Sequence, residues 1–247
     1  MTQRFISQPA FAQMMNMIDI PGGERISQSA AYPADVIANM KLFWGNIQTV
    51  RDSYNRMQQG YLSVIQNNKD YNPDYIAKKV ADFYTAMFND QAAELLRAKN
   101  RLEETRGLID LKTQLPLTDP NPAVHEMKLL NAREEVKLAL DGVKDNDLVS
   151  TLVDLVKSSL TTEPAIAYYL VATPAYKRLL KNSIALLDYE QGELDALKRL
   201  MVPAELHGYL DAQPALKDME RALGQAESAR GFAAMDYPEL NITLDSF

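Results

Sequence analysis

The sequence of 247 residues contains no cysteine. This absence excludes disulfide bonds, thiolate nucleophiles and sites in which cysteine binds zinc or an iron–sulfur cluster. Glycine is also scarce, with 10 residues, and alternating runs of β-branched and aromatic residues are nearly absent. The common residues are mostly good helix formers, so composition alone favours an all-α protein.

Positive charge is not in excess anywhere along the chain. There are 26 Lys and Arg residues against 33 Asp and Glu residues, which gives a formal net charge of −7. Because positive and negative residues are interspersed, the sequence contains no basic stripe that could displace the counterions of a nucleic acid. Nucleic acid is therefore not expected as a partner.

Long apolar runs are missing as well. The longest uncharged stretches, residues 5–18 and 164–176, are too short to cross a bilayer, and both contain proline. The N-terminal residues lack the aliphatic core of a signal peptide. We therefore expect a soluble protein with no membrane span and no signal peptide, located in the cytoplasm or within an assembled particle.

Histidine is rare, and the 2 histidines lack the spacing that metal sites need. A di-iron helical bundle places glutamate three residues before histidine. Pro122 and Ala204 occupy those positions before His125 and His207. A serine nucleophile elbow, a phosphate-binding loop and a dinucleotide fingerprint are also missing. We therefore predict a non-enzymatic protein that has no metal and no cofactor.

The most specific pattern is a heptad repeat between Pro33 and Asn67. Apolar residues recur there at alternating spacings of four and three, which is typical of a helix seam in a coiled coil. At about 1.5 Å per residue, such a helix would span roughly 50 Å. The seam positions are Val36, Met40, Phe43, Ile47, Val50, Tyr54, Met57, Tyr61 and Val64.

A second long helix is predicted from Pro73 to Lys112. Asn72 supplies an N-cap acceptor, and proline suits the first turn because its missing N–H would lack a helical partner there. The early seam continues, but residues 91–112 are more polar and the apolar face drifts. The short linker predicts an antiparallel hairpin, whose polar end protrudes or is supported by another chain.

Beyond the proline-rich loop 113–122, further helices are predicted at 122–142, 147–160, 164–171, 174–201, 203–211 and 214–235. The predicted fold is an elongated all-α protein, with a long coiled-coil-like hairpin and a C-terminal helical bundle. Its predicted parts are an N-terminal arm with a short amphipathic helix (1–32), the hairpin (33–113), the bundle (122–235) and an acidic tail (236–247).

Several residues are candidates for contacts with other proteins. The apolar face of residues 8–18 is expected to fold back on the core or to dock on a partner chain. Insertion into a membrane surface is less favoured, because it would need more Lys and Arg on the polar face. The acidic tail with its final Phe packs locally or serves as a peptide ligand. Seam tyrosines need partners for their hydroxyl groups, which hints at a shared seam. The candidates are Phe11, Met14, Met15, Ile18, Ile47, Val50, Tyr54, Met57, Tyr61 and Phe247.

These patterns favour a structural or assembly subunit that forms homo-oligomers or docks on partner proteins through long helices. Components of phage virions, scaffolds and secretion apparatus also associate through long helices, and this comparison is an analogy of composition and shape alone. Two alternatives stay open. One is a helical-bundle enzyme or small-molecule binder with a site built from scattered residues, and the other is a helical adaptor that binds peptides.

Overall fold

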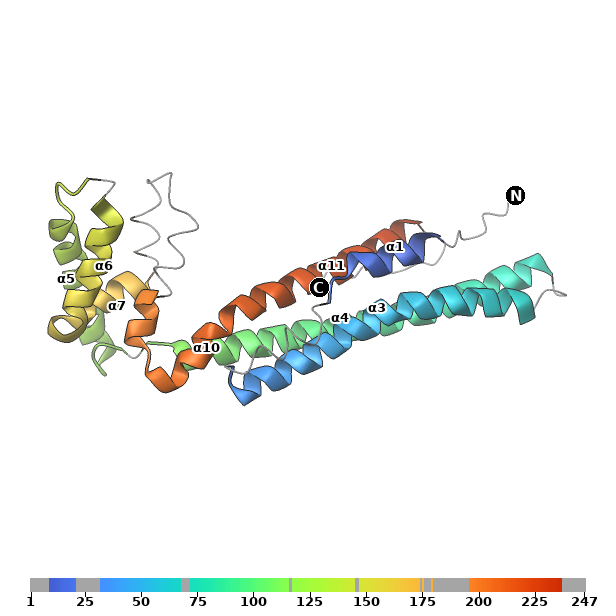
Figure 1. Ribbon diagram of the computed structural model, residues 1–247, viewed down its shortest axis with the longest axis horizontal. Helices are drawn as coiled ribbons and strands as arrows, with labels where there is room; N and C mark the ends of the chain where they lie inside the picture. The colour runs from blue at the N-terminus through green and yellow to red at the C-terminus, as the bar shows by residue number, and fades with distance from the viewer. Residues whose placement is uncertain are drawn as a thin grey trace. The chain divides into compact units, whose positions relative to one another are not determined.

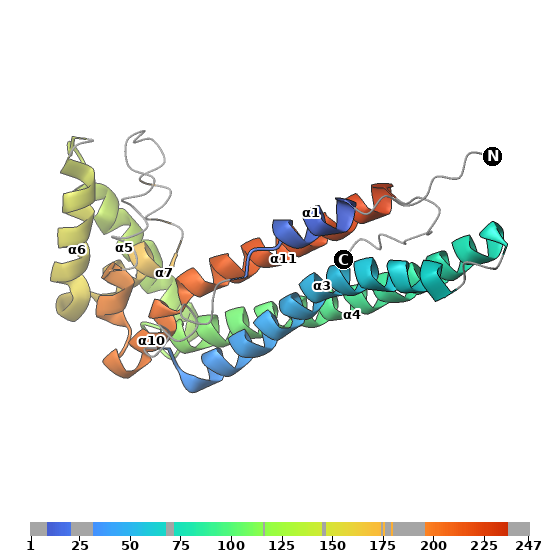
Figure 2. The same cartoon turned by 45° about the vertical axis from the view of Figure 1, so that its right-hand side comes forward.

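The computed structural model describes residues 9–20, 32–67, 72–115, 117–144, 147–173, 175, 179 and 196–236 (Figures 1 and 2). These residues form helices and their connections, with no strand among them, which confirms the all-α prediction. The helices are α1 (Pro9–Met17), α3 (Ala34–Asn67), α4 (Pro73–Thr113), α5 (Pro122–Ala139), α6 (Leu148–Thr162), α7 (Pro164–Ala172), the 3₁₀ helix η3 (Ala204–Leu206), α10 (His207–Asp211) and α11 (Gln213–Asp236).

The chain forms two compact units. The first, here called the hairpin unit, contains residues 1–109 and 211–247, and the second unit contains residues 110–210. The helix α11 therefore groups with the hairpin, whereas the sequence analysis placed it with the other helices of 122–235. Most of the helix predicted at 174–201 and the tail from residue 237 lie outside the described residues. The division into four parts stays a prediction.

The heptad seam of α3 forms the centre of the hairpin unit. Phe43, Ile47 and Val50 have no exposed surface, and the seam is buried from Val36 to Met57. Each such side chain contributes about 1.5–3 kcal/mol when it leaves water. The seam is thus filled by helices of the same chain.

One face of the far half of α4 is also buried within this chain, so this half does not protrude as the first of the two expectations had it. Its seam continues through Gln91, Ala98 and Thr105, whose polar or small side chains concealed the repeat. Part of this half is covered by α11, where the Arg106 guanidinium lies 2.5 Å from the Glu220 carboxylate. The buried α4 positions are Val80, Tyr84, Phe88, Gln91, Leu95, Ala98, Leu102, Thr105 and Ile109.

A second layer, formed by α1 and α11, covers the hairpin. The two helices run alongside each other in both views (Figures 1 and 2), and α1 also packs on α3. Small side chains let α11 approach closely, since its buried seam is mostly alanine. The buried residues of α11 are Met219, Ala222, Leu223, Ala226, Ala229, Arg230 and Ala233.

The second unit packs α7 against α5 and α6 around an aliphatic core. Val136 from α5, Val156 from α6 and Leu170 from α7 are buried together there. The predicted Asn-Pro helix start is confirmed at α5. The side chain of Asn121 accepts a hydrogen bond of 3.0 Å from the Ala123 N–H, and Pro122 occupies the first turn.

The two hairpin helices approach each other closely at Gly60. A Cβ atom built there would lie 2.3 Å from Cζ of Phe83, whereas a Cβ at Gly45 would have no neighbour within 4 Å. The rings of Tyr61 and Tyr84 stack beside this contact, with centroids 6.5 Å apart. The packing of the Phe83 ring therefore favours glycine at position 60.

We expect Gly60→Ala to lower the free energy of unfolding by about 1–3 kcal/mol, because the ring must move to admit the methyl group. The matched variant Gly45→Ala should raise it by up to about 1 kcal/mol through higher helix propensity. Chemical denaturation followed by circular dichroism measures both changes. Equal effects of the two substitutions would contradict the close approach at position 60.

Candidate functional site

The helix α5 carries apolar side chains on two opposite sides. Its inner side contributes Ala132 and Val136 to the core of the second unit. Its outer side carries Met127, Leu130 and Leu138, which are 57%, 60% and 75% exposed. A helix that is apolar on both sides is usually covered on both sides. We call Met127, Leu130 and Leu138 the outer face of α5.

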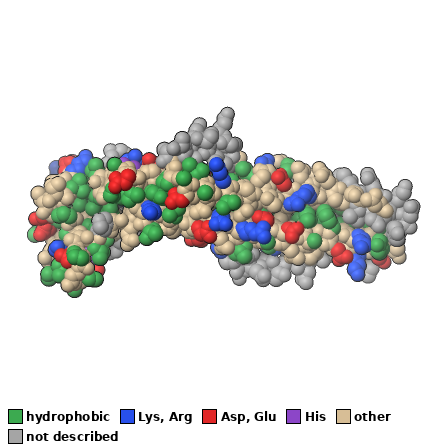
Figure 3. Space-filling view, turned by 90° about the horizontal axis from the view of Figure 1, so that it is seen from below, with side chains coloured by type: hydrophobic (Ala, Val, Ile, Leu, Met, Phe, Trp, Pro, Cys, Tyr) green, Lys and Arg blue, Asp and Glu red, His purple; other side chains and the backbone are tan. Residues whose placement is uncertain are grey.

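The outer face also carries a charged pair. Glu134 lies between Leu130 and Leu138 and forms an ion pair with Lys137, in which Nζ and Oε1 are 2.6 Å apart. The positive charge of Lys137 holds the pKa of Glu134 below its usual value, chiefly through this hydrogen bond. In Figure 3, hydrophobic side chains are frequent on the surface of the second unit. The outer face therefore combines apolar side chains with one ion pair.

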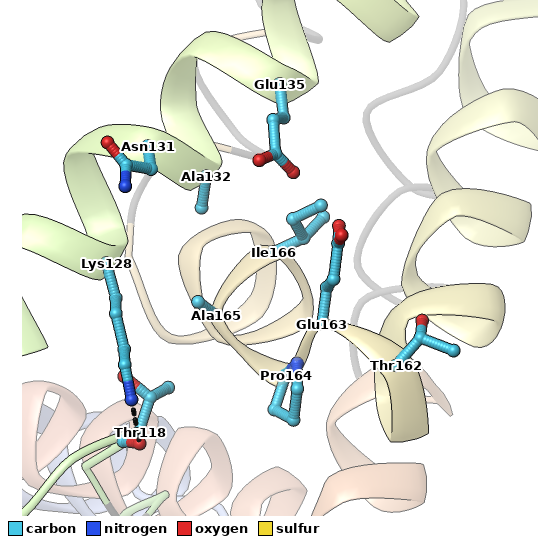
Figure 4. A pocket seen from close by; sticks show the side chains of 10 residues that line it. All are labelled: Thr118, Lys128, Asn131, Ala132, Glu135, Thr162, Glu163, Pro164, Ala165 and Ile166. Carbon is cyan, nitrogen blue, oxygen red and sulfur yellow. Dashed lines mark hydrogen bonds between the residues drawn. The ribbon is translucent and has the colours of Figure 1, made fainter.

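A hollow of about 430 Å³ lies beside the inner side of α5 (Figure 4). Lys128 lines it, but Nζ of this lysine is 2.9 Å from Oδ2 of Asp119 and donates a hydrogen bond to the Thr118 carbonyl. The other lining residues are Asn131, Ala132, Glu135, Thr162, Glu163, Pro164, Ala165 and Ile166.

Two carboxyl groups face each other across this hollow. Glu135 extends from α5 and Glu163 precedes α7, and their carboxyl groups point toward one another (Figure 4). A hydrogen bond with Glu163 and the repulsion between the two like charges raise the pKa of Glu135 above its ordinary value of 4.5. The pair therefore holds a proton more tightly than an isolated glutamate does.

Both histidines hold turns together. The Thr118 N–H donates to Nδ1 of His125 over 3.2 Å, and the buried imidazole meets the Tyr168 ring edge-on at 5.0 Å. Nε2 of His207 donates to the Val202 carbonyl over 2.9 Å. Within the described ranges, no group of three or more acidic or histidine side chains is placed to hold a metal ion.

The N-terminal candidates pack on their own chain. Met14 and Ile18 are buried, with 3% and 1% of their surface exposed, and Met15 is half-buried. The helix that carries them contacts α3 and α11. The side chain of Phe11 and the whole of Phe247 lie outside the described residues. Folding back on the core therefore accounts for the described part of this face.

The seam candidates are core residues of the hairpin unit. Ile47, Val50, Tyr54 and Met57 have no exposed surface, so another chain cannot reach them while the unit is closed. Tyr61 is half-buried and stacks on the Tyr84 ring.

The partners of the Tyr54 hydroxyl also come from this chain. Burial raises the pKa of Tyr54, while a hydrogen bond with Gln91 and the positive charge of Arg230 partly oppose the rise. The tyrosine was the reason for expecting a shared seam, and here the neighbouring polar groups are intramolecular. The Tyr54 hydroxyl therefore needs no second chain to provide polar neighbours.

Sequence reasoning missed the outer face of α5. The signal was present, because Met127, Leu130, Glu134 and Leu138 follow one another at helical spacings of three and four. These residues lie opposite the side that carries Val136. The helix was predicted, but its apolar residues were not sorted by face. A helical wheel of residues 122–139 would have separated the two sides.

No match to this chain was found among protein families, curated proteins or solved structures. The site therefore has to be interpreted from its own geometry.

None of the helices in the described part of the chain combines the length and the apolar character needed to cross a membrane.

The carboxyl pair predicts a pH dependence. Because the pKa of Glu135 is raised, its stabilising contribution is present below the ordinary value of 4.5 and is lost as pH rises through the folded-state pKa. Glu135→Gln should therefore raise the melting temperature at pH 7, and this advantage should vanish near pH 4. Glu126→Gln, an exposed neighbour on α5, is the control for loss of one charge. A constant difference across this pH range would contradict the pairing.

Proposed function

We propose that this chain is a non-enzymatic structural or assembly subunit that associates with protein partners through the outer face of α5. The observation that carries the proposal is the exposure of Met127, Leu130 and Leu138 along one helix face. Exposed apolar side chains gathered on one helix face mark candidate protein interfaces, and the Glu134–Lys137 pair gives this face a polar contact as well. Phage virion, scaffolding and secretion-apparatus components remain the classes of protein that such a subunit would suit.

The burial of the α3 seam supports this choice of surface. The strongest apolar pattern in the sequence is already occupied by α4, α1 and α11 of the same chain, so it does not drive association. In the second unit, three large exposed apolar side chains share one face of α5, whereas the exposed Leu111, Leu117 and Leu200 lie on other segments. Association through α5 needs no opening of either core.

The alternative of small-molecule binding in the α5–α7 hollow has less support. The charged groups that line the hollow already have partners within the chain, since Lys128 pairs with Asp119 and Glu135 with Glu163. A bound ligand would have to displace these contacts. The outer face of α5 requires no such exchange, because its side chains meet solvent.

Charge placed on the outer face tests the proposal. The double variant Leu130→Glu and Leu138→Glu should reduce self-association to a monomer of 27.8 kDa. Burying either carboxylate in an apolar contact would cost several kcal/mol of binding free energy. Light scattering coupled to size exclusion, over a range of protein concentrations, measures the mass.

Leu42→Glu is the matched control, since Leu42 is 50% exposed and lies on α3 in the hairpin unit. It should leave the concentration dependence of the mass unchanged. A parent protein that is monomeric at every concentration would contradict self-association. Dissociation by Leu42→Glu together with no effect of the α5 variant would assign association to the hairpin unit.

A further inference from the structure

The two histidines of the chain form hydrogen bonds of opposite kinds. Nδ1 of His125 lies 3.2 Å from the backbone nitrogen of Thr118, within residues 117–121, which lead into α5 and are here called the connecting segment. A backbone N–H can only donate, so Nδ1 must accept. Nε2 of His207 lies 2.9 Å from the Val202 carbonyl oxygen, which can only accept, so Nε2 must donate. Both neutral rings therefore carry their proton on Nε2.

A second proton enters at Nδ1 in both rings, with different consequences. In His125 it occupies the lone pair that accepts from the Thr118 N–H, so two N–H groups face each other and the bond is lost. In His207 it leaves the bond to the Val202 carbonyl in place and strengthens it, because the donor is then charged. Imidazole groups change charge between about pH 5 and 8. Of the two histidines, His125 alone can thus couple proton uptake to the release of a backbone contact.

The hydroxyl group of Thr118 also contacts the His125 ring. Its Oγ1 lies 2.8 Å from Nδ1. A hydroxyl can donate or accept, so it can turn and accept a hydrogen bond from the protonated Nδ1. The backbone N–H of Thr118 has no such freedom. The amide of Thr118, rather than its side chain, is therefore the group whose hydrogen bond depends on the protonation of His125.

The charges around the imidazole oppose each other. Asp119 follows Thr118 in the connecting segment, and Lys128 lies about one turn along α5 from His125, with Oδ2 and Nζ of this pair 2.9 Å apart. The carboxylate attracts an imidazolium and the ammonium repels it. From α7, which carries no charged residue, the Tyr168 ring meets the imidazole edge-on. The direction of the Thr118 hydrogen bond therefore decides the response to a proton.

Other contacts of the connecting segment persist in mild acid. The hydrogen bond from Lys128 is the main reason that the pKa of Asp119 lies below its ordinary value of 3.8, so this ion pair survives at about pH 5. Oδ1 of the same carboxylate accepts a hydrogen bond of 3.0 Å from the Asn121 N–H. Release is therefore confined to the Thr118 end of the segment.

We propose that His125 is a proton-sensitive latch, which holds the connecting segment on α5 while its imidazole is neutral and releases the Thr118 amide when the imidazole takes up a proton. The latch lies directly before α5, the helix that carries the outer face. His207 takes no part in it, because its bond to the Val202 carbonyl survives protonation. The latch acts within one chain, so it does not depend on self-association.

Nuclear magnetic resonance of the isotopically labelled full chain tests the latch. Between about pH 8 and 5, exchange of the Thr118 amide proton with water, corrected for its intrinsic pH dependence, should rise roughly two- to tenfold. The rise should follow the titration of the His125 imidazole signals. The Asn121 amide, which is bonded to Asp119, should keep its protection. Constant protection of Thr118 during the His125 titration, or an imidazole that is still neutral at the acidic end, would overturn the proposal.

Two variants assign the response to one histidine. His125→Asn places a carboxamide oxygen near the position of Nδ1, and this oxygen accepts at every pH in the range, so Thr118 should stay protected. His207→Gln is the matched control, since it removes the other histidine and should retain the parent response. A response that persists in His125→Asn or disappears in His207→Gln would overturn the latch. If His125→Asn does not fold, the parent titration and His207→Gln decide the question.

Discussion

The burial of the α3 seam is the constraint on which the rest of the hairpin unit depends. Tyr54 and Met57 have no exposed surface and the seam residues before them are also buried, so α3 must be covered along most of its length. In the hairpin, α4 covers only one side of α3, and α1 and α11 cover the rest of the buried seam. The unit therefore joins residues 1–109 to residues 211–247, and the second unit is inserted between them. A discontinuous unit follows from the need to cover one long helix.

Polar side chains interrupt the apolar core of the hairpin unit. Ser53 lies on α3 and Gln91 and Thr105 lie on α4, and all three are buried. Nε2 of Gln91 donates to Oγ of Ser53 over 2.5 Å, which joins the two hairpin helices. A buried hydrogen bond favours the alignment in which its two partners meet. Apolar burial thus supplies most of the free energy of folding, and the Ser53–Gln91 bond favours one alignment of α3 on α4.

Much of the fold could be predicted because proline and heptad spacing act locally. Pro73 and Pro122 marked helix starts that the structure confirms, and the α3 seam was recognised from spacing alone. The α4 seam was partly missed, because Gln91 and Thr105 are polar and Ala98 is small even though all three are buried. The position of α11 could not be predicted, because a helix face made mostly of alanine carries no sequence signal for the helix on which it packs. The outer face of α5 needed the fold, because only burial of Val136 shows which side is free.

The central claim is that the hairpin core is closed within one chain and that association uses the outer face of α5. Two methionines of the chain report on these surfaces, since Met57 has no exposed surface and Met127 is 57% exposed. Hydroxyl-radical footprinting at low and high protein concentration, read by mass spectrometry of methionine oxidation, tests the claim most directly. The account predicts that Met57 stays protected at both concentrations and that Met127 becomes protected only at the higher one. Protection of Met57 that depends on concentration, with Met127 oxidised equally throughout, would contradict it.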